Sequence, residues 1–576
     1  MAKGYRLVDR DQPFLFPPDM REWLAPDHPV WLVIRVVEQH LDTSAFHAGR
    51  RTGGVGAAGY DPDMLVTVLV WAYAHQVTSS RRVEQLCGTD VAFRLICAGN
   101  LPDHATIARF RGASGDAIAG FFAEVLVLCA RLGMGRLGVV ALDGTKIAAS
   151  ASKAANRTEA KLAQLAREIV ARHAETDAAE DELFGDARGD EVPPGAWRPG
   201  SRDERIRAAL AGLQAEREAA EQAGQAQAEA FRARQRAGRR TGCSPDSAAV
   251  ALAEENLARV TAAQQAKIDD WAVRNARSVA QTGRRLRNPP RRPAGQHVRV
   301  RQAAAQVEKA RARAAEAARR AAEREKNRKG PGPVRNLTDP DSRLMPVRGG
   351  GFIQGYNAQN VTSSDGLIIA TELTADPADC TWFEPMARAA EDAAALITAS
   401  RPATGQDAAR IGLLLADAGY CSEHNLTTPG PDRLIAVGKH RGLEHAARGG
   451  GTAGRQRAGP AAQAMAKRLT TEDGLTAYRQ RGHIAETPHG NIKHNLGFRQ
   501  LSMRGHRKCS AEWAFIVIVH NLLTAITSGH LTPPGPRQPR HLSHPAARHR
   551  PPAPATKGDT ASSTRQHHPA AAKARP

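Results

Sequence analysis

Three acidic residues stand where carboxylates could carry out metal-dependent chemistry. Asp143 directly follows the apolar run Val139–Leu142, and Asp417 directly follows a second apolar run, "LLLA", at 413–416. Glu486 lies in the basic segment "YRQRGHIAETPHGNIKHNLGFRQ". Apolar runs this short are typical of buried strands. If the two strands are neighbours in one sheet, their terminal carboxylates meet at the same edge, and a helix that crosses this edge can bring Glu486 to them.

Three carboxylates gathered in this way repel one another unless cations neutralise them. Oxygen ligands with open positions suit Mg²⁺ or Mn²⁺. Two such ions, about 4 Å apart, can activate a water or a 3′-hydroxyl and stabilise the leaving oxygen of a phosphodiester, which is in-line phosphoryl transfer on DNA. Each acid taken alone has an ordinary structural explanation. Asp143 with Gly144 fits a turn that ends the strand, Asp417 fits an ordinary strand end, and Glu486 fits a solvated position on a helix.

The charge balance points to a polyanionic partner. The 576 residues include 80 Lys and Arg against 59 Asp and Glu, a net charge of +21, so nucleic acid is the first candidate and a generally solvated basic surface the alternative. The seven cysteines are scattered without a C-x-x-C pair, which argues against a disulfide framework or a zinc finger. We expect no apolar window long enough to cross a membrane, and the N-terminal segment is too charged for a secretory signal, so the sequence predicts a cytoplasmic protein without a membrane partner.

Residues 1–132 read as a series of short helices, with Asp61 and Asp103 as helix caps. Arg109 and Arg111 lie on the helix that follows Asp103. Short helices joined by tight turns can form a DNA-binding unit, which makes these two arginines candidate contacts to DNA ends. Plain helical packing explains the same pattern, and both interpretations stay open here.

The rest of the chain divides by composition. The first strand lies within 133–154, and the region 155–335 is rich in Ala, Arg, Glu and Gln, which predicts long exposed helices, with an antiparallel coiled-coil-like hairpin as one arrangement. Within it, 281–330 carries 16 Lys and Arg against four Glu, which suits either a solvated helix or contacts to the DNA backbone. The region 336–528 has two strand-like runs around the turn "SSDG" and ends in helices, and the Pro- and Ala-rich region 529–576 predicts a disordered basic tail.

Four segments, in this order, carry a family resemblance: "VVALDGTKIAASASK", "DPDSRLM" with "GFIQGYNAQ", "LLLADAGY", and the segment around Glu486. Together they resemble bacterial insertion-sequence transposases of the DDE type, and more narrowly the group with a Tyr-Arg-Glu-Lys signature around the last acid. The resemblance covers about residues 10–525, interrupted by the helical insertion. It implies an α/β catalytic domain with an RNase H-like mixed sheet flanked by helices. It also implies that Asp143, Asp417 and Glu486 are the catalytic residues that bind two Mg²⁺ or Mn²⁺ ions.

The signature maps onto Tyr478, Arg481, Glu486 and Lys493, and the resemblance implies DNA contacts for Tyr478, Arg481 and Lys493. The spacing from Arg481 to Glu486 is one residue longer than is usual in the family, so Arg479 is a rival for the arginine position. Lys493 lies seven residues after Glu486 and should share its helix face, where it could hold a phosphate beside the metals.

Three further features have weaker functional signals. Pro488 predicts a kink, or the start of a new helix, near Glu486. The stretch "GYNAQ" at 355–359 resembles a family segment whose role is either in the site or that of a polar edge strand. His520 and Asn521, in "VHNLL", are expected to be helix-packing residues rather than ligands.

The function predicted from these observations is that of a DNA transposase. It would bind the terminal inverted repeats of its own element, cut the strand, and join the freed 3′-hydroxyl to target DNA in the bacterial cytoplasm, associated with the nucleoid. A homo-oligomer is expected, because two element ends must be brought together. The alternatives are a non-catalytic DNA-binding or coiled-coil interaction protein derived from a decayed transposase, and a nuclease of the same fold that cuts but does not join.

Overall fold

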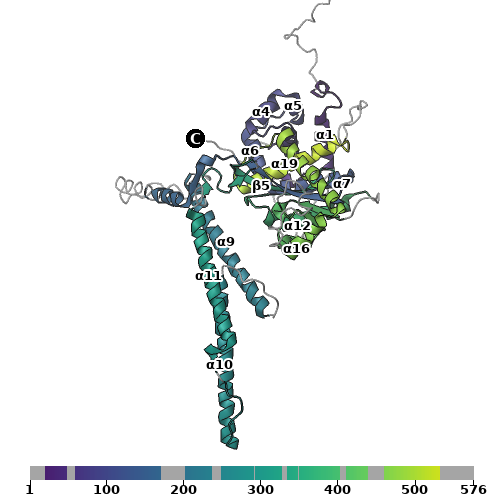
Figure 1. Cartoon of the computed structure of the whole chain (residues 1–576). Coiled ribbons are helices and arrows are strands. Elements are labelled where there is room, and N and C mark those ends of the chain that lie inside the picture. The colour runs from purple at the N-terminus through teal and green to yellow at the C-terminus, as the bar shows by residue number, and fades with distance from the viewer. Residues whose placement is uncertain are drawn as a thin grey trace, which may run out of the picture.

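The computed structural model of the chain is of mixed α/β architecture. It describes residues 20–48, 59–169, 171, 202–236, 248–290, 292–326, 334–347, 349–402, 410–438 and 459–531, so the predicted tail lies outside the described residues beyond 531. A mixed sheet surrounded by helices forms the body, and a helical arm projects away from it (Figure 1).

The N-terminal region is helical, as predicted. Asp61 caps the helix that begins at Pro62 and accepts a hydrogen bond from the Asp63 amide (2.9 Å), and Asp103 accepts one from the Thr106 amide (2.9 Å). Both predicted caps are therefore confirmed. The elements are η1 (Met20–Trp23), α1 (Pro29–Arg35), η2 (Val36–His40), α2 (Ser44–His47), α3 (Pro62–Ala74), α4 (Ser80–Thr89), α5 (Val91–Ile96), α6 (His104–Ala113) and α7 (Gly115–Arg131).

These N-terminal helices share a hydrophobic core with the rest of the body. Val66 of α3 and Phe121 of α7 belong to the same buried cluster as Leu142 in the central strand and Ile516 in the last helix, α19 (His506–Thr527). Burial of large apolar side chains such as these contributes about 1.5–3 kcal/mol each. The helical N-terminal region and the sheet therefore stabilise one another.

The main sheet has six strands: β1 (Val139–Ala148), β4 (Arg343–Pro346), β5 (Phe352–Ser363), β6 (Ile368–Thr374), β7 (Leu413–Ala416) and β8 (Arg433–Ile435). The central strand β1 pairs antiparallel with β5 on one side and parallel with β7 on the other. Both β4 and β6 pair antiparallel with β5, and β8 continues the sheet parallel to β7. The strand order across the sheet is thus β6-β5-β1-β7-β8, with β4 alongside one end of β5.

The predicted first strand is longer than expected. The alternative that Asp143 and Gly144 form a turn that ends the strand is wrong, because β1 continues to Ala148 and Gly144 pairs with Gln359 of β5. The ladder with β5 keeps the backbone extended through the glycine, so Asp143 lies in mid-strand and not at a strand end. The hairpin predicted around "SSDG" is confirmed: it joins β5 to β6, and Gly366 takes the left-handed conformation that its turn requires (φ +85°).

Helices cover both faces of the sheet. Ala141 and Leu415 form a cluster with Met465 of α16 (Pro460–Leu469). Their strand neighbours Leu142 and Leu414 point to the opposite face, because side chains alternate along a strand, and they join the core that includes α12 (Phe383–Ser400). The sheet is therefore a buried layer between helices, where polar side chains need hydrogen-bond partners within the protein.

The last helix also belongs to this core. The sequence had suggested that no window is long enough to cross a membrane, but among the described residues α19 is long and apolar enough by itself, and 72% of its apolar window is buried within the fold. His520 and Asn521 pack as expected. Asn521 accepts from the amide of Ile368 (3.0 Å) and donates to its carbonyl (2.9 Å), so it binds the start of β6.

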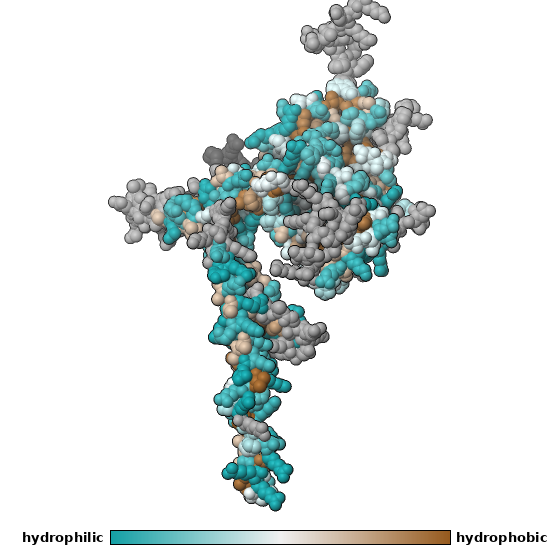
Figure 2. Space-filling view, in the orientation of Figure 1, coloured by the Kyte–Doolittle hydropathy of each residue, from teal (hydrophilic) through white to brown (hydrophobic). Residues whose placement is uncertain are grey.

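The helical insertion begins and ends at a two-stranded ribbon, in which β2 (Asn156–Thr158) pairs antiparallel with β3 (Val334–Asn336). Its long helices are α9 (Arg202–Arg236), α10 (Ala249–Thr282) and α11 (Val298–Lys326), after a helix over 159–169. The helices α10 and α11 lie side by side along the arm, whose visible surface is mostly hydrophilic (Figures 1 and 2). An ion pair between Arg311 and Glu254 (2.8 Å) links the two helices, and the base of the arm is tied to the body by Glu216, which pairs with Arg335 and Arg343.

Candidate active site

Strand register brings Asp143 and Asp417 together. Leu142 of β1 pairs with Ala416 of the parallel strand β7, so the two aspartates that follow them are neighbours at this edge of the sheet. Asp417 also caps the short helix η8 (Ala418–Tyr420) and accepts a hydrogen bond from the Gly419 amide (2.8 Å). The predicted convergence of these two acids is therefore present, although only Asp417 follows the end of its strand.

The helix that carries Glu486 contains two wide π-helical turns. It consists of α17 (Glu472–Arg481), η9 (Gly482–Glu486), α18 (Thr487–Gly490) and η10 (Asn491–Asn495). A π turn takes up one residue more than an α turn, so Arg481 and Glu486, five apart, come onto the same side. Pro488 lies in the α-helical turn between the two π-helical segments, and the helix runs past it. The extra residue between Arg481 and Glu486 is thus accommodated by the π turn.

Arg481 lies between two of the three acids. Its guanidinium is 3.6 Å from Asp143 Oδ1 and 3.6 Å from Glu486 Oε1, and its side chain is only 12% exposed. Its Nη1 atom is buried without a hydrogen-bond partner in the described structure. Arg479, the rival for this position, has an exposed side chain. Arg481 is accordingly the arginine that faces the acids.

His489 is a site residue that the sequence reasoning missed. Its Nδ1 atom is 3.6 Å from Asp143 Oδ2, and its Nε2 atom is 2.9 Å from Asn360 Nδ2. Thr371 donates to Asn360 Oδ1 (2.6 Å), which orients the amide so that its nitrogen faces His489. Nε2 is then the acceptor, and the Nδ1 proton points toward Asp143. The available signal was its position, three residues after Glu486 on the same helix.

The two aspartates have pKa values that move apart. Burial alone would raise the pKa of Asp143, but the His489 contact, the charge of Arg481 and the Gly144 amide together hold it below its usual range. Burial and the neighbouring charge of Asp143 raise the pKa of Asp417, against smaller opposite effects of the Gly419 amide and Arg481. Asp143 therefore favours its ionised form. A negative charge on Asp417 is less favourable, because the group is buried and the charge of Asp143 is close by.

Lys493 lies against β1 on the same side as Asp143. Its ammonium donates to Thr145 Oγ1 (2.5 Å) and to the Lys146 carbonyl (2.7 Å). Burial lowers its pKa, and the charge of Asp143 acts in the opposite direction. The ammonium also has a third N–H, which these two bonds do not use.

Tyr478 is placed differently from the DNA contact that the resemblance implied. Its side chain is 6% exposed, and its hydroxyl donates to the Ala416 carbonyl (3.1 Å), one residue before Asp417. Burial raises its pKa to about 12. A ring held in this way packs the helix against the end of β7 and has no surface to offer to DNA.

The two arginines of α6 also differ from each other. Arg109 is exposed, and its guanidinium donates to Thr106 Oγ1 (3.1 Å) and to the Ala105 carbonyl (3.3 Å) on its own helix. Arg111 instead donates to the Thr78 carbonyl and to Ser502 Oγ (3.1 Å). Arg111 therefore joins the N-terminal helices to the segment before α19, and only Arg109 has the exposure that a DNA contact needs.

The carboxylate set fits a hard divalent cation in its chemistry. Asp143, Asp417 and Glu486 offer only oxygen donors, and Asp417, whose pKa is raised by burial and by the charge of Asp143, lies where a cation would compensate negative charge. The three acids are arranged around the Arg481 guanidinium, which contacts two of them and acts on the third through its charge.

The only metal-type cluster with ligand atoms all within 4.8 Å of one another, among the described residues, lies elsewhere in the chain. It consists of His47, Asp61 and Asp63 on α2 and the start of α3. Asp61 is the helix cap there, and His47 already lies 2.8 Å from Asp63 Oδ1. The active-site acids do not meet this criterion with Arg481 between them.

Comparison with known families finds two matches, one in the N-terminal helical region and one in the C-terminal helices. Residues 18–113 match the family described as "Transposase domain (DUF772)", and residues 451–525 match the family described as "Transposase DDE domain". A search of curated proteins and of solved structures finds no match. Both matched families are transposase families, so the two matches support a transposase function.

The two matches together support an insertion-sequence transposase of the DDE type. The DDE match includes Glu486 and Lys493 but does not extend to Asp143 or Asp417, so the assignment of these two aspartates depends on the strand register described above. The narrower Tyr-Arg-Glu-Lys signature stays a prediction.

Proposed function

We propose that this transposase cuts DNA at the ends of its element with divalent metal ions and joins the freed 3′-hydroxyl to target DNA. The observation that carries the proposal is the grouping of Asp143, Asp417 and Glu486 around Arg481 at one edge of the sheet. The strand order β6-β5-β1-β7-β8, with three antiparallel strands followed by two parallel ones, supports an RNase H-like catalytic fold.

Asp143, Asp417 and Glu486 would hold Mg²⁺ or Mn²⁺. Two such ions, when bound, activate a water or a 3′-hydroxyl and stabilise the leaving oxygen of the phosphodiester. Asp143 is held ionised by His489 and Arg481, and is thereby ready to bind a cation. Arg481 also orients Glu486 and compensates its charge.

Lys493 would bind a DNA phosphate next to the acids with its remaining N–H. Its bonds to Thr145 and Lys146 fix the ammonium beside β1, so the charge is positioned before DNA arrives. Tyr478 is a positioning residue in this proposal, because its hydroxyl holds the end of β7 next to Asp417.

The helical arm would give the transposase a further contact with DNA. Val300, Ala303 and Val307 of α11 are buried at spacings of three and four residues, which is typical of a coiled-coil seam. Basic side chains dominate the segment 281–330, which suits contacts to phosphates along the duplex. We place the protein at the nucleoid as a homo-oligomer, because two element ends must be joined in one reaction.

The test is cleavage of a labelled DNA fragment that carries the inverted repeats flanking the gene. Wild-type protein with Mg²⁺ is expected to cut at the element end and to join that end to a second, unlabelled DNA. Asp143→Asn should bind the end with unchanged affinity and cut about 100- to 1,000-fold more slowly, because one ligand of the catalytic ions loses its charge. Asp392→Asn, an exposed change of the same type on α12, is the matched control and should cut normally.

The outcomes separate the candidate functions. Cleavage by Asp143→Asn at the wild-type rate contradicts the assignment. Cutting by the wild type without joined products indicates a nuclease of the same fold. End binding with no cutting by the wild type, at any Mg²⁺ or Mn²⁺ concentration, indicates a non-catalytic DNA-binding protein.

A further inference from the structure

The central strand has a second polar face, opposite the one that carries Asp143. Side chains alternate along a strand, so Asp143 and Thr145 face the helix that contains Glu486, whereas Gly144 and Lys146 face the other way. Gln359 and Asn357 of β5 pair with Gly144 and Lys146, and they share this second face. The proposed catalytic roles use only the first face.

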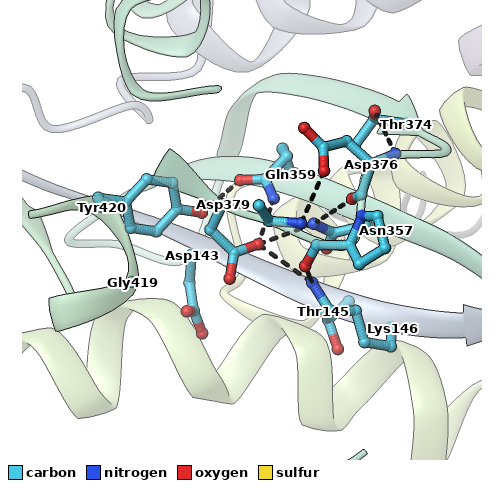
Figure 3. Close-up of polar contacts among 12 residues, drawn as sticks. Asp143, Thr145, Lys146, Asn357, Gln359, Thr374, Asp376, Asp379, Gly419 and Tyr420 are labelled. Atoms are coloured by element: carbon cyan, nitrogen blue, oxygen red, sulfur yellow. Dashed lines mark hydrogen bonds and ion pairs between the residues drawn. The ribbon is translucent and has the colours of Figure 1, made fainter. Parts of the chain in front are cut away.

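Asp379 accepts hydrogen bonds from the polar side chains of the second face. It lies just before η7 (Cys380–Trp382), and its Oδ1 atom accepts hydrogen bonds from Lys146 Nζ (3.1 Å), Asn357 Nδ2 (2.7 Å) and Gln359 Nε2 (2.8 Å). Figure 3 shows these three donors converging on one carboxylate, while Asp143 points to the opposite side of the strand. The Lys146 and Asp379 side chains are 16% and 24% exposed, so this ion pair is mostly removed from solvent.

The carboxylate lies directly against the backbone of β1. A Cβ atom added at Gly144 would come within 2.6 Å of both Asp379 Oδ1 and Gln359 Nε2, a distance that such contacts do not allow. Gly144 is therefore required for this close approach. Asp143 thus presents its carboxylate on one face of the strand, and Gly144 leaves room for Asp379 to lie against the other face.

The same group reaches the second aspartate. The Tyr420 hydroxyl donates to Gln359 Oε1, and Tyr420 ends the short helix η8 that Asp417 caps. At Gly419, a Cβ atom would lie 3.3 Å from Asp379 Oδ2 and 2.9 Å from Asp417 Oδ1. Asp379 thus bonds to the strand of Asp143 and lies close beside the loop of Asp417.

We propose that Asp379 is a positioning residue that sets the separation of Asp143 and Asp417 from the far face of the sheet. It acts through Lys146, Asn357 and Gln359 on β1 and β5, and through Tyr420 on the loop after β7. The inference deepens the proposed function and rests on it. Removing residues that orient metal ligands typically costs about 10- to 100-fold in metal affinity or activity, and we expect an effect of this size here.

The experiment measures Mn²⁺ binding to the full-length protein without DNA, by electron paramagnetic resonance, together with the Mg²⁺ concentration for half-maximal cleavage. Asp379→Ala should raise both half-saturation values about 10- to 100-fold, while end binding stays within about twofold of the wild type. Saturating metal should restore much of the cleavage rate, because the ligands themselves remain. Asp376→Asn is the matched control: this carboxylate lies on the same loop but accepts from the Ala378 amide and the Thr381 hydroxyl, so its values should not change.

Gly144→Ala provides an independent test of the same contact. The added methyl group would push Asp379 and Gln359 away from β1, so this variant should shift metal dependence in the same direction as Asp379→Ala. If Asp379→Ala does not fold, Asp379→Asn and Gly144→Ala decide the question. Wild-type half-saturation values in the folded variants would overturn the inference.

Failure of this inference can be told from failure of the proposed function. If Asp143→Asn is inactive and Asp379→Ala has wild-type metal dependence, only the role of Asp379 is refuted. If Asp143→Asn cuts normally, the proposed function itself falls, and the role of Asp379 falls with it.

Discussion

His520 makes the stability of the folded protein dependent on pH in a defined window. The side chain is 3% exposed, and burial, together with a small effect of His489, lowers its pKa from 6.5 to about 4. Asn491 Nδ2 lies 3.0 Å from its Nδ1 atom, and Gly366 O lies 3.2 Å from its Nε2 atom. A neutral ring that accepts at Nδ1 and donates at Nε2 satisfies both contacts, whereas a protonated ring would face Asn491 with a second donor.

The size of the effect follows from the shift. Between pH 6.5 and about 4 the unfolded chain binds a proton at this histidine and the folded protein does not, so acidification favours unfolding. A difference of roughly 2.5 pH units corresponds to about 3 kcal/mol at 1.36 kcal/mol per unit. The free energy of unfolding should therefore be unaffected by this group above pH 7 and fall by about 3 kcal/mol as the pH reaches 4.

The assay is urea unfolding followed by tryptophan fluorescence at several pH values, for the wild type and for His520→Gln. Other groups titrate in the same pH window, but their contributions are common to the wild type and His520→Gln and cancel in the difference between the two proteins. The stability of the wild type relative to the variant should decrease by about 3 kcal/mol from pH 7.5 to pH 4. A difference that stays constant to within about 0.5 kcal/mol over this range would refute the account of a buried neutral histidine.

Two further predictions concern the active site. Asp417→Asn should abolish cleavage and raise the melting temperature of the metal-free protein at pH 7. It removes a negative charge that is unfavourable because the site is buried and Asp143 is close by, and the amide oxygen can still accept the hydrogen bond from Gly419. A lower melting temperature would contradict this. Tyr478→Phe should lower the free energy of unfolding by about 1 kcal/mol, because the hydrogen bond to Ala416 is lost. End binding should stay unchanged, because the buried ring makes no contact with DNA. A large loss of DNA affinity in a gel-shift assay would instead support the predicted DNA contact of Tyr478.

Much of the fold could be predicted from local sequence signals. Asp61 with Pro62, and Asp103, predicted helix starts because capping is a local effect of a few neighbouring residues. The hairpin around "SSDG" was likewise readable, because its turn residues lie within the hairpin itself. The stretch "GYNAQ" was less so: it looked compatible with an edge strand, but β5 has partners on both sides, and pairing depends on strands that are distant in the sequence.

The candidate site was predictable in its acids and less so in their surroundings. Asp143 and Asp417 could be connected because apolar runs precede both of them. The interpretation of Gly144 as the end of the strand was wrong, since a glycine in a strand ladder and a glycine in a turn look the same without the partner strand. The sequence sign of the π turn that brings Arg481 toward Glu486 is the extra residue between them, which does not by itself say where it is accommodated; His489 and Asp379 reach the site only through the packing of a helix and a loop.

The central claim is that Asp143, Asp417 and Glu486 together bind the catalytic ions. The most direct measurement is a crystal soaked with Mn²⁺, with the ions located by anomalous diffraction. We expect Mn²⁺ bound by these three carboxylates, with loss of that signal in Asp143→Asn. Mn²⁺ found only at His47, Asp61 and Asp63, the cluster whose ligand atoms lie within 4.8 Å of one another in the described residues, would contradict it.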